Sequence, residues 1–533
     1  MPPDTEKQAA SLTDDQKTGR HEELEVVPIE QGVSQEPYRV HLSWRSWLVV
    51  FITCFAVMAQ VFVVVAAGSV IAFIIRDLGD ASIAGWVIQG PLLMQSVLSP
   101  IVGRLSDVLD RKFLATVPPL AAFVGAVVSA KATSMSMLIG GGILIGTTLA
   151  TISVVQAIPS EILPLKFRAL ANGFAFVGGA VGGLIGSLGA GAPPFTVLQQ
   201  SGSFASTGLR DTSNTLERRY ETAYGPVIQL DPYYLSAAQR LCCSDLIGPE
   251  ERTLEWRGRS DGLVAHVFFR KNANFVYSVF AFAVEGWIFY SAVNSVVPQI
   301  ALNLGFESNA WRISVRQLSY QLPVLFASVP ITWYATRFKD MQAPLLVTFT
   351  IFLIVTICYS TIQPSWSLAQ LGFNVLAGIG QAGPLTLLVA CIQFTAPHAF
   401  LSTATGLAFS ARAIGGAFGS AVLNAIINGR LASHYAASIE KAALGAGLAI
   451  ESMPALLEAL ATGQIGSGVD TATPTVWNAA VEVSRWEYAH AYRLAWASVI
   501  PFVVLAIVAV ALLKGVKDLM TEEVEATVER VES

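Results

Sequence analysis

The feature that most constrains this sequence is a series of apolar runs, each long enough to cross a lipid bilayer as one helix. The hydrocarbon core of a bilayer is about 30 Å thick, and a helix needs about 20 residues to cross it. The runs are residues 46–75, 82–102, 114–130, 134–156, 169–191, 274–300, 311–333, 344–362, 366–394, 401–427 and 494–513. Backbone groups inside a bilayer must pair within their own segment, so these eleven spans predict an all-α membrane protein.

Composition supports this prediction and excludes other classes. Hydrophobic residues make up 53% of the 533 residues and charged residues only 13%, about half the share in soluble domains. A net charge of −5 argues against a nucleic-acid partner. The histidines and cysteines show no metal-ligand spacing, and neither a phosphate-binding glycine loop nor a nucleophile and base pair stands out. We therefore expect no enzyme, no cofactor and no metal site.

A compact charged segment, Gly103–Lys112, lies between the second and third runs and reads Gly-Arg-Leu-Ser-Asp-Val-Leu-Asp-Arg-Lys. Its charged side chains need water or protein around them, because charge is costly in hydrocarbon. A connection this short makes the two flanking helices antiparallel neighbours. If the N-terminus is cytosolic, this segment lies inside together with Lys166 and Arg168, as the positive-inside rule requires.

An internal repeat relates the two halves of the chain at an offset of 233 residues. Matched pairs include Gly173 with Gly406, Phe176 with Phe409, Gly182 with Gly415, Gly183 with Gly416, Arg104 with Arg337, and Asp107 with Asp340. The offset carries both a glycine-rich run and the charged segment. It therefore predicts two sister bundles in the same orientation, with a binding site between them near the midplane.

These patterns divide the chain into five expected parts. They are a disordered cytosolic tail at 1–45, an N-terminal bundle of five spans at 46–192, a polar irregular segment at 193–265, a C-terminal bundle of six spans at 266–515 with an extramembrane hairpin or loop at 429–490, and a cytosolic tail at 516–533.

Several motifs resemble those of one family. The pattern Gly-x-x-x-Asp-x-x-x-Arg-Lys at 103–112 resembles the loop between helices 2 and 3 of major facilitator superfamily transporters, with Val108 and Asp110 in place of a basic residue and a glycine. Stretches at 159–168, 285–291, 404–416 and 491–496 resemble the fungal trichothecene efflux pump and siderophore transporter branch. The resemblance implies a two-bundle transporter that moves a bulky hydrophobic molecule and draws energy from a proton gradient. We expect a monomer in the lipid bilayer of a fungal plasma membrane.

The polar segment 193–265 does not fit this plan. Five spans from a cytosolic start end outside, yet Arg270 and Lys271 are expected inside. The repeat predicts a sixth helix after Gly191, and members of the resembled branch commonly have fourteen spans. The sixth helix and two linker helices are therefore missing. Two explanations stay open: a faulty gene model, which we favour, or a real chain that does not transport.

Two groups of charged residues are candidates for function. Gly103, Asp107, Arg111 and Lys112 form a possible conformational latch, in which the aspartate accepts hydrogen bonds from a neighbouring helix N-terminus and the arginine pairs with the facing bundle. The alternative is a solvated topology loop. Glu285, deep in the sixth recognised span, is a candidate proton carrier, with Arg412 as its charge partner and Arg316 as a second. The alternative is a structural ion pair.

A third group consists of polar and aromatic residues at membrane depth that could line a cavity for a large ligand. They are Gln60, Gln89, Gln95, Asn294, Tyr320, Gln321, Gln381, Trp287 and Tyr290. For any one of them, hydrogen bonding between helices is the competing interpretation. The glycines expected to let helices pack closely are Gly178, Gly179, Gly182, Gly183, Gly415 and Gly416.

The leading functional hypothesis is a secondary transporter that exports a hydrophobic toxin or secondary metabolite, trichothecene-like, by alternating access. A siderophore–iron importer of the same fold and a transport-incompetent member are the alternatives. The sequence does not distinguish the direction of movement, because the same helices rock between two states.

Overall fold

A computed structural model describes most of the apolar part of the chain. The described residues are 44–78, 85–108, 111–163, 165–191, 268, 273–397, 400–462, 466 and 472–520. All of them belong to one compact unit, Ser43–Ser533. The expected tail at 1–45 falls outside the described residues except for its last two positions, and the polar segment 193–265 lies wholly outside them.

Helices account for nearly all of the described first half. They are α1 (Trp44–Leu78), α2 (Trp86–Val108), α3 (Arg111–Ala130), α4 (Met135–Leu149), α5 (Ile152–Ile162), the 3-10 turn η1 (Leu165–Phe167) and α6 (Arg168–Gly191). The helices α4 and α5 follow each other through a short turn at Ala150 and Thr151, and together they cover the fourth predicted span.

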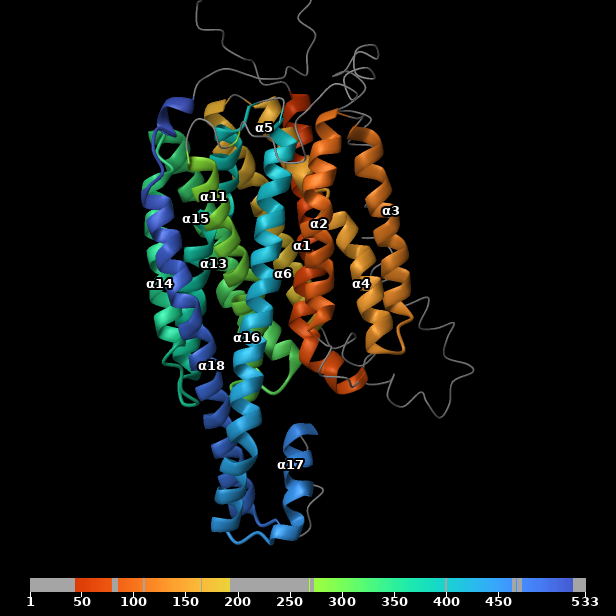
Figure 1. Cartoon of the computed structure of the whole chain (residues 1–533), viewed down its shortest axis with the longest axis vertical. Coiled ribbons are helices and arrows are strands. Elements are labelled where there is room, and N and C mark those ends of the chain that lie inside the picture. Colours follow the sequence, from red (N-terminus) through yellow and green to blue (C-terminus); the bar gives the residue numbers. More distant parts are fainter. Residues whose placement is uncertain are drawn as a thin grey trace, which may run out of the picture. The chain divides into compact units, whose positions relative to one another are not determined.

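The described second half is also helical. It contains α11 (Asn274–Gly286), the π-helix η4 (Trp287–Val296), α12 (Val297–Asn303), α13 (Ala310–Phe338), α14 (Gln342–Tyr359), α15 (Ser367–Thr395), α16 (Leu401–Gly445), η6 (Ile450–Ser452), α17 (Met453–Thr462), α18 (Pro474–Ala511) and η7 (Lys517–Leu519). Figure 1 shows the long helices running alongside one another.

The all-α membrane class is confirmed, with eight stretches of the described residues long and apolar enough to span a bilayer. The predicted second, third and seventh spans are the helices α2, α3 and α13, which are not among those eight. Within α3, the apolar stretch Val117–Ala130 is shorter than a full span. The eleven predicted runs therefore all fold as helices, and eight of the described stretches have the length and hydropathy of a span.

Helix ends follow the local sequence. Ser134 caps α4 by accepting a hydrogen bond from the Met137 amide at 3.3 Å, and Asn309 caps α13 through the Trp311 amide at 3.0 Å. Side-chain oxygens at these positions satisfy amides that the first helical turn leaves unpaired.

The charged segment differs from its prediction as a loop, because α2 continues to Val108 and α3 begins at Arg111.

The repeat appears in the way the helices pack. Within the halves, α1 packs on α6, and α11 with η4 packs on α16; between the halves, α2 packs on α16 and α13 packs on α6. Glycines permit the closest approaches. A Cβ on Gly182 would lie 2.1 Å from the Met58 carbonyl oxygen, and one on Gly415 would lie 2.0 Å from the Ala283 carbonyl oxygen. Only glycine allows such backbone contact.

The other glycines of the packing set face different partners. A Cβ on Gly178 would lie 2.3 Å from the Cys54 carbonyl oxygen, whereas Gly179 faces the side chains of Val57 and Val61. Gly416 faces the ring of Tyr290, and Gly183 faces the side-chain amide of Gln321. Backbone approach thus occurs at some of these glycines, and side-chain packing at the others.

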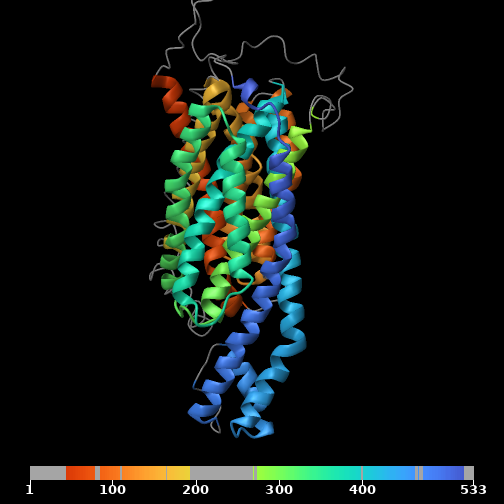
Figure 2. The ribbon, with the colours of Figure 1, turned by 90° about the vertical axis from the view of Figure 1, so that its left-hand side faces the viewer.

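The interval 429–490 contains the ends of two long helices. Figures 1 and 2 both show α16 and α18 continuing together past the other helices, with α17 beside them. These three helices share a small apolar core around Ile439, Leu456 and Trp477. The Tyr435 and Ser484 hydroxyls lie 2.9 Å apart, which links α16 to α18 there.

Candidate functional site

A fully buried ion pair lies between α11 and α16. Glu285 has no exposed surface, and Arg412 is 4% exposed. The Arg412 Nε donates to Glu285 Oε2 at 2.5 Å, and Nη2 donates to Oε1 at 2.9 Å, so the pairing is bidentate. Two parallel charge-assisted hydrogen bonds fix both side chains. The structure therefore brings the proposed proton carrier and its first proposed partner together.

Neighbouring side chains complete the pair. Gln381 of α15 donates a hydrogen bond to Glu285 Oε1, and Arg412 Nη1 donates to the Tyr290 hydroxyl at 2.8 Å. The guanidinium carbon also lies over the Phe282 ring, 5.3 Å from its centroid, and over the Phe289 ring, 5.1 Å from its centroid. Aromatic faces attract a desolvated cation. Four helical elements thus hold the two charges away from water.

The backbone beside the pair is adapted to it. A Cβ on Gly286 would lie 2.0 Å from the Arg412 carbonyl oxygen, so α11 and α16 touch through backbone at this point. The π-helix η4 begins at the next residue and carries Tyr290 and Asn294. Wide turns of this kind occur mostly at functional sites within helices.

Arg316 is not part of this group, and its prediction as a second partner of Glu285 is wrong. Its Nη1 lies 3.0 Å from Glu307 Oε1, and its Nε donates to Gln370 Oε1 at 2.7 Å. The reason is position, since Arg316 lies near the start of α13 and Glu307 lies in the preceding turn. An arginine in this place satisfies its charge locally instead of reaching the bundle centre.

The polar and aromatic residues proposed for a cavity lie in different surroundings. Gln60 bonds across helices, donating to the Thr148 carbonyl and the Thr151 hydroxyl, both at 3.1 Å. Trp287 packs against Phe418 and Phe502. Gln60 and Trp287 thus belong to the packed interior. Gln89 lies beside Gly85, and Gln321 lies beside Gly183.

Six residues of the set keep a buried polar atom without a partner among the described residues. These atoms are Gln60 Oε1, Gln95 Oε1, Trp287 Nε1, Asn294 Nδ2, the Tyr320 hydroxyl and Gln381 Oε1. A buried polar atom without a partner is costly, so such atoms mark places where water or a ligand can bind. Gln381 connects this group to the ion pair, because its amide nitrogen already bonds to Glu285.

The latch residues meet the start of α16. Asp107 accepts hydrogen bonds from the Thr403 amide at 2.8 Å and the Ser402 amide at 3.2 Å, and also from the Thr403 hydroxyl. A Cβ on Gly103 would lie 2.5 Å from the Ser402 carbonyl oxygen. An acidic group beside the first turn of a helix interacts favourably with its unpaired amides. The side chains of Arg111 and Lys112 lie outside the described part of the chain.

Sequence reasoning missed a second contact between the halves. The Arg168 Nη1 donates to the Gln393 carbonyl at 3.0 Å, and Gln393 Oε1 accepts from Ser160 and Asn172, both at 2.8 Å. Arg168, which the sequence analysis expects only to lie on the cytosolic side, is 2% exposed and therefore buried. The available signal was the repeat itself, because Ser160 and Gln393 are equivalent positions 233 residues apart.

Equivalent residues that touch must lie beside the axis relating the halves. Gln393 bonds to Asn172 of the first half and also to Thr405 of the second half, its Nε2 donating to the Thr405 hydroxyl at 3.3 Å. Asn172 and Thr405 are themselves matched by the repeat. We call the end of the bundle that carries Arg104, Asp107, Arg168 and Phe400 the basic end. There the halves are joined at the axis.

This chain is similar to known proteins. The family model described as Major Facilitator Superfamily matches residues 47–195 and 244–420, which is more than half of the chain. The chain belongs to the major facilitator superfamily. This confirms the family suggested by the charged segment.

Two solved structures show the same fold as this chain. A bacterial homologue of the human lysosomal transporter Spinster, inward-facing and unoccupied, aligns with a TM-score of 0.58 at 17% identity, covering 88% of this chain and 98% of the other. Its occupied form aligns with a TM-score of 0.57 at 16% identity, covering 88% and 96%. At these identities the likeness concerns fold alone.

Curated relatives match this chain over shorter stretches. MFS-type transporter pydD of Acremonium sp is 26% identical over 26% of this chain and 25% of its own length. Tetracycline resistance protein, class H, of Pasteurella multocida is 34% identical over 19% of this chain and 27% of its own. MFS-type transporter gkaD of Penicillium citrinum is 30% identical over 22% and 20%. The chain thus spans about a quarter of the length of these relatives.

Proposed function

We propose that this transporter exports a hydrophobic toxin or secondary metabolite across the plasma membrane in exchange for protons, by alternating access. One observation carries the proposal: a bidentate Glu285–Arg412 pair with no exposed carboxylate surface, at the depth where a charge is most costly. An ionisable pair in that position is the expected form of a proton relay in a membrane protein.

The pair connects proton binding to helix packing. A proton on Glu285 removes the negative charge that holds Arg412, and Arg412 also bonds to Tyr290 of the π-helix. Because α11 and α16 touch through backbone at Gly286, a change at the pair acts directly on their contact. A ligand that bonds to the free oxygen of Gln381 would act on the same carboxylate through the amide group.

The contacts at the basic end act as the gate in this proposal. The hydrogen bonds of Asp107 to the start of α16 and of Arg168 to Gln393 join the two halves, so this end opens only when they break. The positive-inside rule places the basic end in the cytosol. Asp107 with Gly103 is then the latch that favours the cytosol-closed state.

The kinds of protein that this chain resembles favour export over import. One is a tetracycline resistance protein and two are fungal MFS-type transporters. The aromatic rings of Phe289 and Tyr290 beside unpartnered polar atoms suit a large, mainly apolar substrate that carries some oxygen or nitrogen.

The test of proton coupling is a paired substitution in proteoliposomes. Glu285→Gln alone leaves Arg412 buried without its partner, so Glu285→Gln combined with Arg412→Gln is the cleaner variant. We expect the double variant to reach the membrane and to lose proton-driven substrate movement, while Glu307→Gln, which alters the partly exposed outer pair, keeps it. Unchanged proton-driven transport in the folded double variant would exclude Glu285 as the carrier.

The direction is tested in cells that lack the transporter and in complemented cells. Export predicts that complemented cells accumulate less of a hydrophobic toxin and tolerate more of it. Higher uptake of a ferric siderophore on complementation would overturn export in favour of the importer. A purified wild-type protein that moves neither protons nor substrate would point to the transport-incompetent alternative.

A further inference from the structure

A hollow of about 280 Å³ lies at the opposite end from the basic end, where α16 and α18 leave the other helices. It is open to one side and lined by Arg430, His490, Arg493 and Leu494. Three of these four side chains can carry positive charge. The exposed cations that the positive-inside rule explains belong to the basic end, so this group has no topological reason to exist.

The polar atoms of this hollow are incompletely used. Arg430 Nε and His490 Nδ1 are buried atoms with no hydrogen-bond partner among the described residues. The ion pair that Arg430 makes among the described residues is long, 3.5 Å from its Nη2 to Glu487 Oε2, and the other oxygen of Glu487 accepts a hydrogen bond from Ser438. The buried Arg430 Nε is a donor without an acceptor, which favours an acceptor that comes from outside the chain.

Arg493 is held in place instead of being free to turn away. Its Nε donates to the Ile362 carbonyl at 2.6 Å, and its guanidinium lies over the Trp486 ring, 5.5 Å from the centroid. The Trp486 ring also lies 5.9 Å from the His490 ring. One tryptophan thus contacts both Arg493 and His490, so the hollow is built in advance of any ligand.

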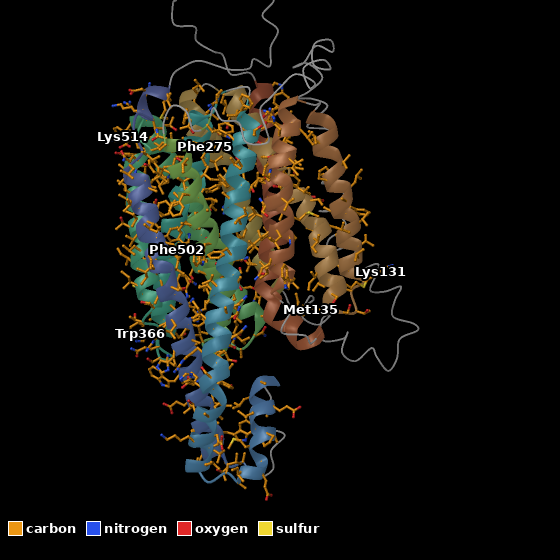
Figure 3. The ribbon with its side chains drawn as sticks, in the orientation of Figure 1. Lys131, Met135, Phe275, Trp366, Phe502 and Lys514 are labelled. Atoms are coloured by element: carbon orange, nitrogen blue, oxygen red, sulfur yellow. The ribbon has the colours of Figure 1, made fainter. Side chains whose placement is uncertain are left out.

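The side chains around the hollow are of the types found at a membrane surface. Trp486 and the half-buried Tyr435 and Tyr488 gather on α16 and α18 near the hollow, as aromatic residues do at bilayer interfaces. Beyond Leu494, which is 52% exposed, α18 presents an apolar row of exposed side chains that includes Leu505 and Val508. Figure 3 places Phe502, on this stretch of α18, at mid-height between Phe275 and Trp366. A molecule with an anionic head and an acyl tail matches both features.

We infer that Arg430, His490 and Arg493 form a binding site for the phosphate of an anionic phospholipid, whose acyl chains lie along the exposed apolar row of α18. Arginine binds phosphate oxygens through several N–H groups at once. The bound lipid ties the extended ends of α16 and α18 to the bilayer and is independent of the Glu285–Arg412 pair.

The test uses the full chain, purified in a neutral detergent, with phosphatidylglycerol, phosphatidylcholine or inorganic phosphate added. Native mass spectrometry counts bound lipid, and thermal melting measures its stabilisation. We expect phosphatidylglycerol to bind and to raise the melting temperature. Arg430→Gln and His490→Gln should weaken binding by roughly tenfold or more, since each loses a hydrogen bond to a charged group.

Matched variants separate this site from general charge. Arg312→Gln removes an exposed arginine from the first turn of α13 and should leave lipid binding unchanged. Arg430→Lys keeps the charge and should restore part of the binding. If Arg493→Gln fails to fold, the other two substitutions still decide the question. Equal binding of all variants, equal stabilisation by phosphatidylcholine, or full protection by inorganic phosphate alone would overturn the lipid site.

Discussion

The two halves of this protein use different side chains at equivalent positions of the helix packing. In the first half, Gln60 of α1 bonds to Thr148 of α4. In the second half, Glu285 of α11 bonds to Gln381 of α15, and Thr148 and Gln381 are equivalent positions of the repeat. The glycine contacts match the first helices as well, since Gln60 follows Met58, and Glu285 follows Ala283, by two residues.

The difference lies in charge. The residue equivalent to Arg412 is Gly179, which faces Val57 and Val61, so the first half holds no ion pair at this point. The shared helix packing therefore does not require one. A buried ion pair adds little net stability compared with well-packed apolar residues. The comparison thus favours a functional reason for the charges of the second half over a purely structural one.

We expect the largest effect on stability from removing one partner of the Glu285–Arg412 pair. Arg412→Gln leaves Glu285 buried and unpaired, which should reduce the free energy of unfolding by about 3–5 kcal/mol. Gln60→Leu, at the matching place, should lose only about 0.5–1.5 kcal/mol, because it removes neutral hydrogen bonds. Unfolding by denaturant titration of the purified variants measures both. Similar losses at the two places would contradict the comparison.

The glycine contacts test whether the halves are equivalent in packing. Gly182→Ala and Gly415→Ala each push a methyl group against a backbone carbonyl, and each should cost about 1–3 kcal/mol of unfolding free energy. The control is Gly429→Ala on α16, where nothing lies within 4 Å of the added carbon. That substitution should be neutral or stabilise by up to about 1 kcal/mol, because alanine favours helix. A loss at one glycine only would show that the repeat does not extend to this contact.

The equivalent aspartates should differ in what they control. Asp107 bonds across the halves to the start of α16, whereas Asp340 accepts from the Gln342 and Ala343 amides of its own following helix. Asp107→Asn should shift the balance between cytosol-open and cytosol-closed states by about 1 kcal/mol, from weaker charge-assisted hydrogen bonds. Distance measurements between labels across the basic end report that balance. Asp340→Asn should leave it unchanged, since asparagine caps helices well.

The smallest effect is expected at the outer ion pair. Glu307 is 22% exposed, so Glu307→Gln should change the free energy of unfolding by about 0–1 kcal/mol. Transport driven by a proton gradient should stay at the wild-type rate. A strong loss of transport in this variant would bring Arg316 back as a participant in proton coupling, through contacts different from those of this state.

The sequence by itself determined the helical membrane class, the family and the repeat. Apolar runs of bilayer length can satisfy their backbone only as helices, and that requirement does not depend on neighbours. It also pointed to Glu285 with Arg412, because two opposite charges at membrane depth have little else to pair with. The role of Asp107 at a helix end followed from similar reasoning, because an aspartate can accept hydrogen bonds from the unpaired amides of a neighbouring helix N-terminus.

Only the tertiary structure decided which polar groups meet. Arg316 bonds to Glu307, Gln60 takes part in helix packing, and Arg168 joins Gln393 at the axis between the halves. Each of these outcomes depends on how far a helix is rotated and how deeply it sits against its neighbours. A sequence fixes the order of side chains along a helix, but the face that each one presents to another helix is set by packing between segments hundreds of residues apart.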